Sequence, residues 1–134
     1  MQVRVSLGVF AMITASQVAE VELHEPAQED EPAIFDLAHL RRYTLDDLPL
    51  QREILELFRV QVLDSVAKLR ASCDDRSAWA MAAHTLKGSA RCVGAFRLGR
   101  AAERAERNSE TAEARARSAG RVAEAAVVTL AHLG

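Results

Sequence analysis

One histidine in this chain has the neighbours that phosphoryl chemistry requires. His84 lies in a helix-forming stretch, with Lys87 three residues later and Gly88 four residues later. On a helix these neighbours occupy the same face as the histidine, one turn away. An imidazole offers a nitrogen nucleophile near neutral pH, and a lysine beside it offsets the negative charge that a phosphoryl group brings. The glycine lets another protein come close, so the spacing predicts a histidine that carries a phosphoryl group.

The same stretch predicts the direction in which His84 points. A helix turns ~100° per residue, so with Trp79 at zero one group of apolar positions falls within roughly 60° and forms a core stripe. These positions are Ala82, Ala83, Leu86, Ala90 and Val93. His84 falls at ~140° and Lys87 at ~80° on this scale. Gly88 falls at ~180° and Arg91 at ~120°. We therefore expect His84 to face water or a partner, surrounded by the other three residues.

Gly88 lies where a glycine is unfavourable for the helix. Inside a helix, glycine costs about 1 kcal/mol relative to alanine. On the outward face no core packing requires it, which favours a site that the backbone or a bulky group of a partner approaches. Two alternatives remain open: Gly88 is a tolerated residue or a local bend, and His84 is an ordinary surface histidine.

Other residues are weaker candidates for chemistry. His24 lies in an acidic segment, His39 on a short helix where it is either packed or solvated, and His132 near the C-terminus, where a cation suits the helix dipole. Cys73 and Cys92 form no CxxC pair and no metal-ligand spacing with a histidine. The sequence lacks a P-loop and a kinase glycine-rich loop, so nothing in it supports ATP binding. We expect no metal site and no cofactor.

The composition predicts a single helical domain without affinity for nucleic acid. The chain has 134 residues, which suits one core. Aromatic residues make up only 4%, so the core must consist mainly of Ala, Leu and Val, which favours close helix packing over a β-sandwich. The formal net charge of -2 gives no electrostatic basis for nucleic-acid binding. No apolar run approaches the roughly 18–20 residues of a membrane span, and we expect a cytoplasmic protein.

We place a domain boundary near residue 33. The segment 20–31 is acidic, contains one proline and is followed by another, which is typical of a linker. Residues 1–33 are therefore expected to form a poorly ordered acidic arm, and residues 34–134 to form the folded domain. Less favoured alternatives for the N-terminus are a cleaved signal peptide, a short strand and a start site at Met12.

Hydrophobic periodicity and capping residues predict the helices of this domain. Asp36 caps the first, Asp46 or Asp47 opens the second, and Gly94 ends the third as a left-handed C-cap. The expected helices are 37–43, 46–71, 76–93, 95–107 and 111–132. The second has the apolar stripe Leu55, Phe58, Val62, Val66 and Leu69, and the last has Val122, Ala126, Leu130 and Leu133. Short connections imply an antiparallel four-helix bundle, with the short additional N-terminal helix packed across one end.

A longer motif extends from His84 into the next predicted helix. It consists of His84-Thr85-Leu86-Lys87-Gly88-Ser89-Ala90, Val93-Gly94-Ala95, Leu98 and Glu106. This motif resembles the histidine-containing phosphotransfer (HPt) domain family. The resemblance implies that His84 is the phosphoacceptor, that Lys87 stabilises the phosphoryl group and that Gly88 provides clearance. We also expect Ser89, the small residue after the glycine, and Arg91 to contribute to the docking of a receiver domain.

The resemblance also implies a function and a set of partners. HPt domains are helical bundles that carry phosphoryl groups between the aspartates of receiver domains. The chain would thus be a phosphoryl carrier of a bacterial multistep two-component phosphorelay, and not an enzyme with its own ATP site. Its partners would be response-regulator receiver domains and a hybrid histidine kinase. The receiver would supply the aspartate and Mg²⁺, so the chain needs no cofactor of its own, and we expect a monomer.

Two other interpretations come from different functional classes. In the first, the bundle docks receiver domains without carrying phosphate, which the presence of His84 argues against. In the second, the chain is an isolated histidine kinase dimerisation domain. Such domains are usually two-helix hairpins that dimerise, whereas this chain has enough helices for a closed monomer. A phosphotransfer assay tests the first interpretation, and sedimentation tests the second.

Overall fold

The computed structural model describes residues 31–133, and this part of the chain is helical without any strand. Its helices are α2 (Leu37–Tyr43), α3 (Leu48–Ala71), α4 (Arg76–Val93), α5 (Phe96–Arg107) and α6 (Ala112–Leu133). The prediction of an all-α domain is confirmed. The expectations for the N-terminal arm concern mainly residues 1–30, which lie outside the described range. None of the described helices is long and apolar enough to cross a membrane.

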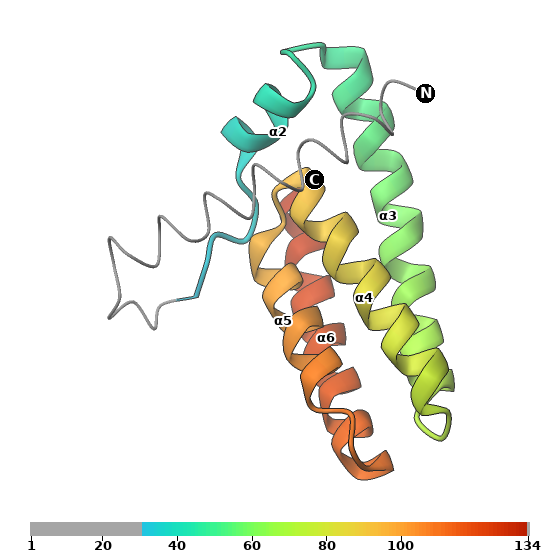
Figure 1. Ribbon diagram of the computed structural model, residues 1–134. Helices are drawn as coiled ribbons and strands as arrows, with labels where there is room; N and C mark the ends of the chain where they lie inside the picture. The colour runs from blue at the N-terminus through green and yellow to red at the C-terminus, as the bar shows by residue number, and fades with distance from the viewer. Residues whose placement is uncertain (1–30, 134) are drawn as a thin grey trace.

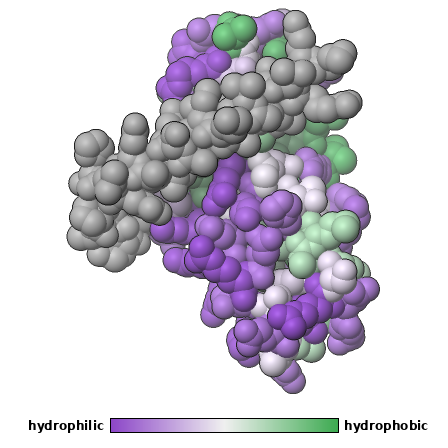
Figure 2. Space-filling view, viewed as in Figure 1, coloured by the Kyte–Doolittle hydropathy of each residue, from purple (hydrophilic) through white to green (hydrophobic). Residues whose placement is uncertain are grey.

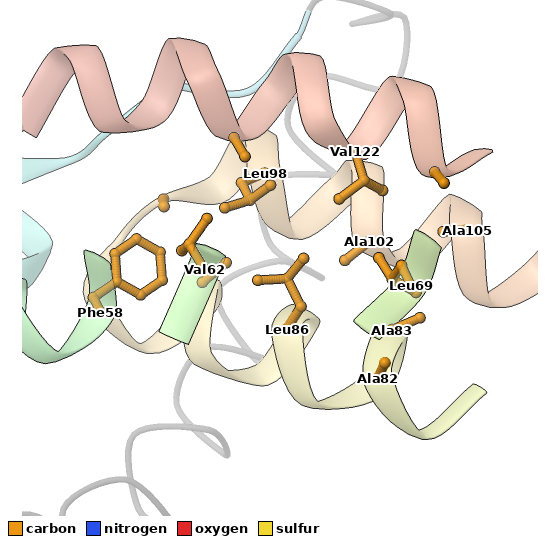
Figure 3. Close-up of a cluster of buried hydrophobic side chains, with 14 of the residues drawn as sticks. Phe58, Val62, Leu69, Ala82, Ala83, Leu86, Leu98, Ala102, Ala105 and Val122 are labelled. Carbon is orange, nitrogen blue, oxygen red and sulfur yellow. The ribbon is translucent and has the colours of Figure 1, made fainter. Parts of the chain in front are cut away.

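The four long helices lie side by side, and the connections between them fall at alternate ends (Figure 1). α4 contacts both α3 and α5, and α6 contacts both α5 and α3, which closes the arrangement around one core. The short α2 lies across one end and contacts α4. Buried side chains from the long helices fill the centre (Figure 3). Each long helix therefore buries one stripe and leaves its opposite face to solvent.

Aspartates begin three of the helices. Asp36, Asp47 and Asp75 each accept a hydrogen bond from the backbone N–H three residues later, at 3.1, 3.0 and 3.1 Å. Each bond satisfies an N–H that has no partner inside its own helix. Of the two candidates for the start of α3, Asp47 is the cap. Asp46 instead adopts a positive φ of 62° and pairs with Arg41.

The core stripe predicted for α4 is confirmed in full. Its members are all buried: Trp79, Ala82, Ala83, Leu86, Ala90 and Val93. The stripes predicted for α3 and α6 are confirmed in part, because four of their residues pack at the margin of the core and are only half-buried. These four are Leu55, Val66, Leu130 and Leu133. The interior is thus built mainly from alanine, leucine and valine, with two large aromatic side chains, Phe58 and Trp79.

Gly94 makes the turn between α4 and α5 possible. Its φ is 94°, in the left-handed region, which confirms the predicted C-cap. A Cβ on Gly94 would lie only 2.7 Å from the backbone oxygen of Asp36. The backbone N–H of Asp36 in turn donates to the carbonyl of Gly94 at 2.9 Å. A glycine is therefore required both by the backbone conformation and by the close approach of the segment before α2.

The residues just before α2 cap α5. The N-cap residue of α5 is Ala95, which has no side chain that could accept a hydrogen bond. Instead the carbonyl of Ala33 accepts from the backbone N–H of Arg97 at 3.0 Å, and the carbonyl of Pro32 accepts from Arg97 Nε at 3.1 Å. Pro32 and Ala33, which the sequence analysis assigned to the end of the arm, therefore contact the helical domain.

Replacing Gly94 by alanine should destabilise the fold by about 2 kcal/mol or more, because a Cβ is strained at positive φ and would collide with Asp36. Gly120→Ala is the matched control, since Gly120 lies inside α6 and an added Cβ meets no atom within 4 Å. The control should keep or raise the Tm, because alanine favours a helix by about 1 kcal/mol over glycine. Thermal unfolding followed by circular dichroism checks both variants, and equal Tm values would contradict the argument.

His39 is buried in the junction between α2 and the rest of the domain. The residue is 1% exposed, and its ring packs edge-on against Phe96 with the centroids 4.9 Å apart. Of the two environments considered for His39, the packed one is thus confirmed. Burial lowers the pKa of His39 to about 4, with Asp36 acting in the opposite direction and Arg42 adding to the decrease. The ring is therefore neutral at pH 7.

Acid should weaken the fold through His39. Its folded pKa of about 4 lies below the unfolded value of 6.5, so the unfolded chain binds more protons between these pH values. The free energy of unfolding therefore falls as the pH decreases through this window, by about 3 kcal/mol from this group when pH 4 is reached. His39→Leu removes the titrating group and should show a flatter dependence in urea unfolding between pH 7 and pH 4. If the stability of His39→Leu depends on pH as strongly as that of the wild type, His39 is not the source of the acid sensitivity.

Candidate functional site

α4 places His84 on its solvent side, opposite the core stripe. The His84 side chain is 69% exposed, which agrees with the direction expected from helical periodicity. Its neighbours Ala83 and Leu86 are fully buried and hold the helix against the core. The imidazole therefore extends to solvent from a helix whose opposite face is anchored in the core.

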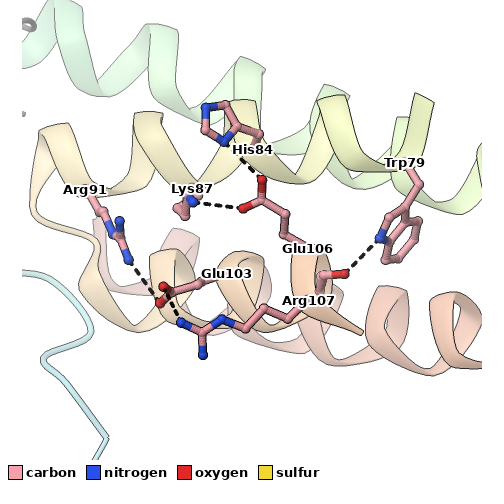
Figure 4. Close-up of polar contacts among 8 residues, drawn as sticks. Trp79, His84, Lys87, Arg91, Glu103, Glu106 and Arg107 are labelled. Atoms are coloured by element: carbon pink, nitrogen blue, oxygen red, sulfur yellow. Dashed lines mark hydrogen bonds and ion pairs between the residues drawn. The ribbon is translucent and has the colours of Figure 1, made fainter. Parts of the chain in front are cut away.

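Glu106 of α5 connects His84 with Lys87 (Figure 4). One carboxylate oxygen, Oε2, lies 3.1 Å from Nδ1 of His84, and the other, Oε1, accepts a hydrogen bond from Nζ of Lys87 at 2.8 Å. We call these three residues the His84 cluster. The Lys87 and Glu106 side chains are 19% and 29% exposed. The ion pair is therefore partly shielded from water, while the imidazole extends beyond it.

The packing of α5 against α4 holds Glu106 in place. The indole N–H of Trp79 on α4 donates to the carbonyl of Ala105 at 2.9 Å, one residue before Glu106. Nearer the turn, Gly99 of α5 faces α4, and a Cβ on Gly99 would lie 3.3 Å from Cγ of Arg91 and 3.7 Å from Cβ of Ala90. Small residues at one end and a buried hydrogen bond at the other thus keep the two helices close. The carboxylate reaches α4 because of this proximity.

The charge of Glu106 determines which nitrogen of His84 is free to react. The hydrogen bond from Lys87 lowers the pKa of Glu106, against the effect of its partial burial, so the carboxyl is ionised at neutral pH. An ionised carboxylate can only accept hydrogen bonds. In the neutral imidazole the proton must therefore be on Nδ1, and Nε2 has an available lone pair. Nε2 points away from Glu106 (Figure 4).

Gly88 leaves the surface beside His84 open. The residue is exposed, and a Cβ added to it would meet no atom within 4 Å. Nothing in the described part of the chain therefore requires a glycine at this position for packing. The space next to the imidazole is available to a side chain or to another molecule.

The two remaining candidates, Ser89 and Arg91, lie outside the His84 cluster. The guanidinium of Arg91 turns to α5 and pairs with Glu103 at 3.0 Å, and Glu103 also pairs with Arg107 at 3.2 Å (Figure 4). Ser89 is half-buried, and no hydrogen bond among residues 31–133 joins it to the cluster. Arg91 therefore shares one carboxylate, Glu103, with Arg107.

Glu106 is the member of the cluster to which the sequence assigned no role of its own. It lies 22 residues after His84 and beyond a turn, so no local spacing relates the two. The sequence does contain one pattern that points to Glu106. α5 has only two carboxylates, Glu103 and Glu106, and their three-residue separation places both on one flank of the helix. Because α5 packs beside α4, this flank of α5 lies next to Lys87 and Arg91 of α4.

Removing the Glu106 carboxylate should change the tautomer of His84. In Glu106→Ala the Nδ1–H loses its acceptor, so the neutral ring shifts from the Nδ1–H form toward the Nε2–H form. Imidazole ¹⁵N chemical shifts, recorded where the ring is neutral, distinguish the two forms. Glu103→Ala removes the other carboxylate of α5 and should leave the His84 signals unchanged. An unaltered tautomer in Glu106→Ala would show that the carboxylate does not orient the ring.

A match to a known protein family covers this site. The family model of the Hpt domain matches residues 53–131, which is more than half of the chain. No curated protein and no solved structure shows a significant match. The matched region contains α4 and α5 and hence the whole His84 cluster. With its helical fold and its exposed histidine on α4, the chain belongs to the Hpt domain family, the histidine phosphotransfer domains of phosphorelays.

Proposed function

We propose that this protein carries a phosphoryl group on Nε2 of His84, between the aspartates of receiver domains in a multistep phosphorelay. The observation that supports this most directly is the bond from His84 Nδ1 to ionised Glu106, which leaves Nε2 as an exposed nucleophile. Hpt domains act in phosphorelays as carriers without an ATP site of their own. The scaffold is the antiparallel four-helix bundle that α3 to α6 form.

In the transfer step, the Nε2 lone pair of His84 attacks the phosphorus of an aspartyl phosphate on the receiver. The N–P bond forms as the P–O bond to the aspartate breaks, and the aspartate leaves as a carboxylate. The imidazole then bears a positive charge, with its Nδ1–H still directed at Glu106. The negative carboxylate stabilises that charge. The reverse step passes the phosphoryl group to the aspartate of a second receiver, and no proton is gained or lost overall.

Lys87 balances the charge that the phosphoryl group brings. Before transfer its ammonium neutralises Glu106 at 2.8 Å, and it lies one helical turn from His84. The phosphoryl group adds negative charge to the same face, where Lys87 is the cation of the His84 cluster. Phosphoryl transfer depends mainly on positioning and on such electrostatic stabilisation. The lysine therefore favours the phosphorylated state.

The receiver domain docks on α4 around Gly88, where the surface is open. Ser89 and Arg91 follow on the same helix and border this surface, Arg91 with a side chain that is 35% exposed. The receiver supplies the reacting aspartate, its Mg²⁺ and its own cation. Within residues 31–133 no three metal-ligating side chains gather into a cluster. The partners in this scheme are a hybrid histidine kinase and response regulators, and the protein acts as a cytoplasmic monomer.

The direct test is phosphotransfer from phosphorylated receiver domains of the same cell to the full chain. His84→Gln should fold normally, because the side chain is exposed, and should take up no phosphoryl group. His132→Gln, which changes an exposed histidine on α6, is the matched control and should be labelled at the wild-type rate. Label in His84→Gln refutes the assignment. A wild-type chain that binds receivers without label is a docking module, and a dimer in sedimentation favours the kinase-type alternative.

Substitutions of Gly88 should move stability and transfer in opposite directions. Gly88→Ala should raise stability by up to about 1 kcal/mol, since the added Cβ meets no atom and alanine favours a helix. Gly88→Gln should keep the helix and crowd the docking surface. We expect the Tm to hold or rise while the transfer rate falls from glycine to alanine to glutamine. Gly120→Gln makes the same change on α6 and should leave the rate unchanged.

Lys87→Ala provides the contrast to the glycine series, because it removes charge without adding bulk. It should slow transfer or shorten the lifetime of the phosphohistidine, while receiver binding measured by titration calorimetry survives. If Gly88→Gln transfers phosphate at the wild-type rate, docking does not need the clearance that the glycine provides.

A further inference from the structure

Arginines line a groove between α5 and α6. One part of it has a volume of about 260 Å³ and extends from the start of α5 to Arg121 of α6. A second part of about 390 Å³ shares Arg121 and continues toward the end of α5. We call it the arginine groove, because six arginines line it and only three glutamates, Glu31, Glu110 and Glu124, do so. The arginines are Arg97, Arg100, Arg104, Arg107, Arg117 and Arg121. The visible surface over α5 is predominantly hydrophilic (Figure 2).

The charges of α5 are separated onto two flanks. Its carboxylates, Glu103 and Glu106, pair with cations of α4, and Glu103 also pairs with Arg107 at the end of α5. Arg97, Arg100 and Arg104 lie along the flank that faces α6. Within residues 31–133, Arg104, Arg117 and Arg121 have no ion-pair partner. Like charges held this close raise each other's electrostatic energy and attract an anionic partner.

A segment of opposite charge is present in the same chain. Residues 1–30 contain five acidic residues and one arginine, which gives them a formal charge of -4. Residues 31–133 contain 16 basic and 14 acidic residues and therefore carry +2. All five acids of the first part lie within residues 20–30. They are Glu20, Glu22, Glu25, Glu29 and Asp30.

The described chain begins at this groove. Glu31 lines it, and its Oε1 lies 3.8 Å from Nε of Arg97. The carbonyl of Pro32 accepts a hydrogen bond from the same guanidinium. From Arg97 to Arg104, α5 rises about 10 Å, which three or four extended residues span, at about 3.3 Å each. The acids that precede Glu31 are therefore close enough along the chain to reach the arginines that lack a partner.

We propose that the acidic segment 20–30 of this chain docks in the arginine groove. Its carboxylates pair with Arg104, Arg117 and Arg121, and they extend the contacts that Glu31 already makes with Arg97. The docked segment then competes with other acidic macromolecules for these arginines. The His84 cluster lies on the other flank of α5 and stays accessible.

Limited proteolysis of the full chain by an endoproteinase that cleaves after glutamate tests this proposal. Cleavage at Glu20, Glu22 and Glu29 should be slow in the wild type, because a docked segment does not fit a protease cleft. The variant Arg104→Gln/Arg121→Gln should be cleaved at these sites at least fivefold faster. The matched control, Arg52→Gln/Arg70→Gln, loses the same charge from exposed positions on α3 and should be cleaved at the wild-type rate. Circular dichroism confirms that each variant is folded.

A charge swap makes the test independent of the loss of arginine alone. Arg104→Glu/Arg121→Glu should speed cleavage at Glu20 and Glu22, and adding Glu25→Arg/Glu29→Arg should restore protection at these two sites. Equal cleavage of the groove variant and the α3 control would overturn the proposal. A second measurement compares the wild type with a variant in which the five acidic residues of 20–30 are replaced by neutral residues. Equal affinity of both chains for a labelled polyglutamate peptide would also overturn the proposal, because the groove of the wild type would then be open to a separate partner. Phosphotransfer plays no part in either measurement.

Discussion

The close packing of α4 against α5 is the constraint on which the site depends. Gly94 turns the chain back, Gly99 lets α5 approach Ala90 and Arg91 of α4 closely, and Trp79 donates a hydrogen bond to the α5 backbone near the far end. This geometry places one carboxylate within hydrogen-bond distance of both a lysine and a histidine. In a looser interface these groups would be surrounded by water. An ion pair that is exposed to water in this way contributes at most about 1 kcal/mol to stability.

One carboxylate thereby has two consequences for the chemistry of His84. Glu106 accepts from Nδ1 and so directs the reactive lone pair to Nε2, the nitrogen that points away from it. It also lies beside the ring and stabilises the positive charge that phosphorylation would create there. Because Glu106 is itself held by Lys87, the three groups respond to a phosphoryl group as one electrostatic unit. His84 is exposed, whereas the ion pair of Lys87 and Glu106 beside it is largely shielded from water.

The same helix relates this site to the arginine groove. The two carboxylates of α5 face α4, where they belong to the His84 cluster and the Arg91 pair, and Arg97, Arg100 and Arg104 face α6. A helix with separated charges suits an antiparallel bundle, since each flank meets a different neighbour. The segment before α2 joins the two regions in sequence, because it caps α5 through Ala33 and contacts Arg97.

The sequence by itself determined the helices, their caps and the direction of His84. These features depend on periodicity and on interactions within about four residues, and the buried stripe from Trp79 to Val93 and the left-handed Gly94 follow from them. Only the tertiary structure decided that Glu106 binds His84, that Arg91 pairs with Glu103, that His39 is buried against Phe96 and that Ala33 caps α5. Several of these contacts join residues from separate helices. Which residues meet depends on how closely two helices pack and on how each helix is rotated about its own axis. That rotation is set by the small and large side chains of the whole core, which no local window of sequence contains.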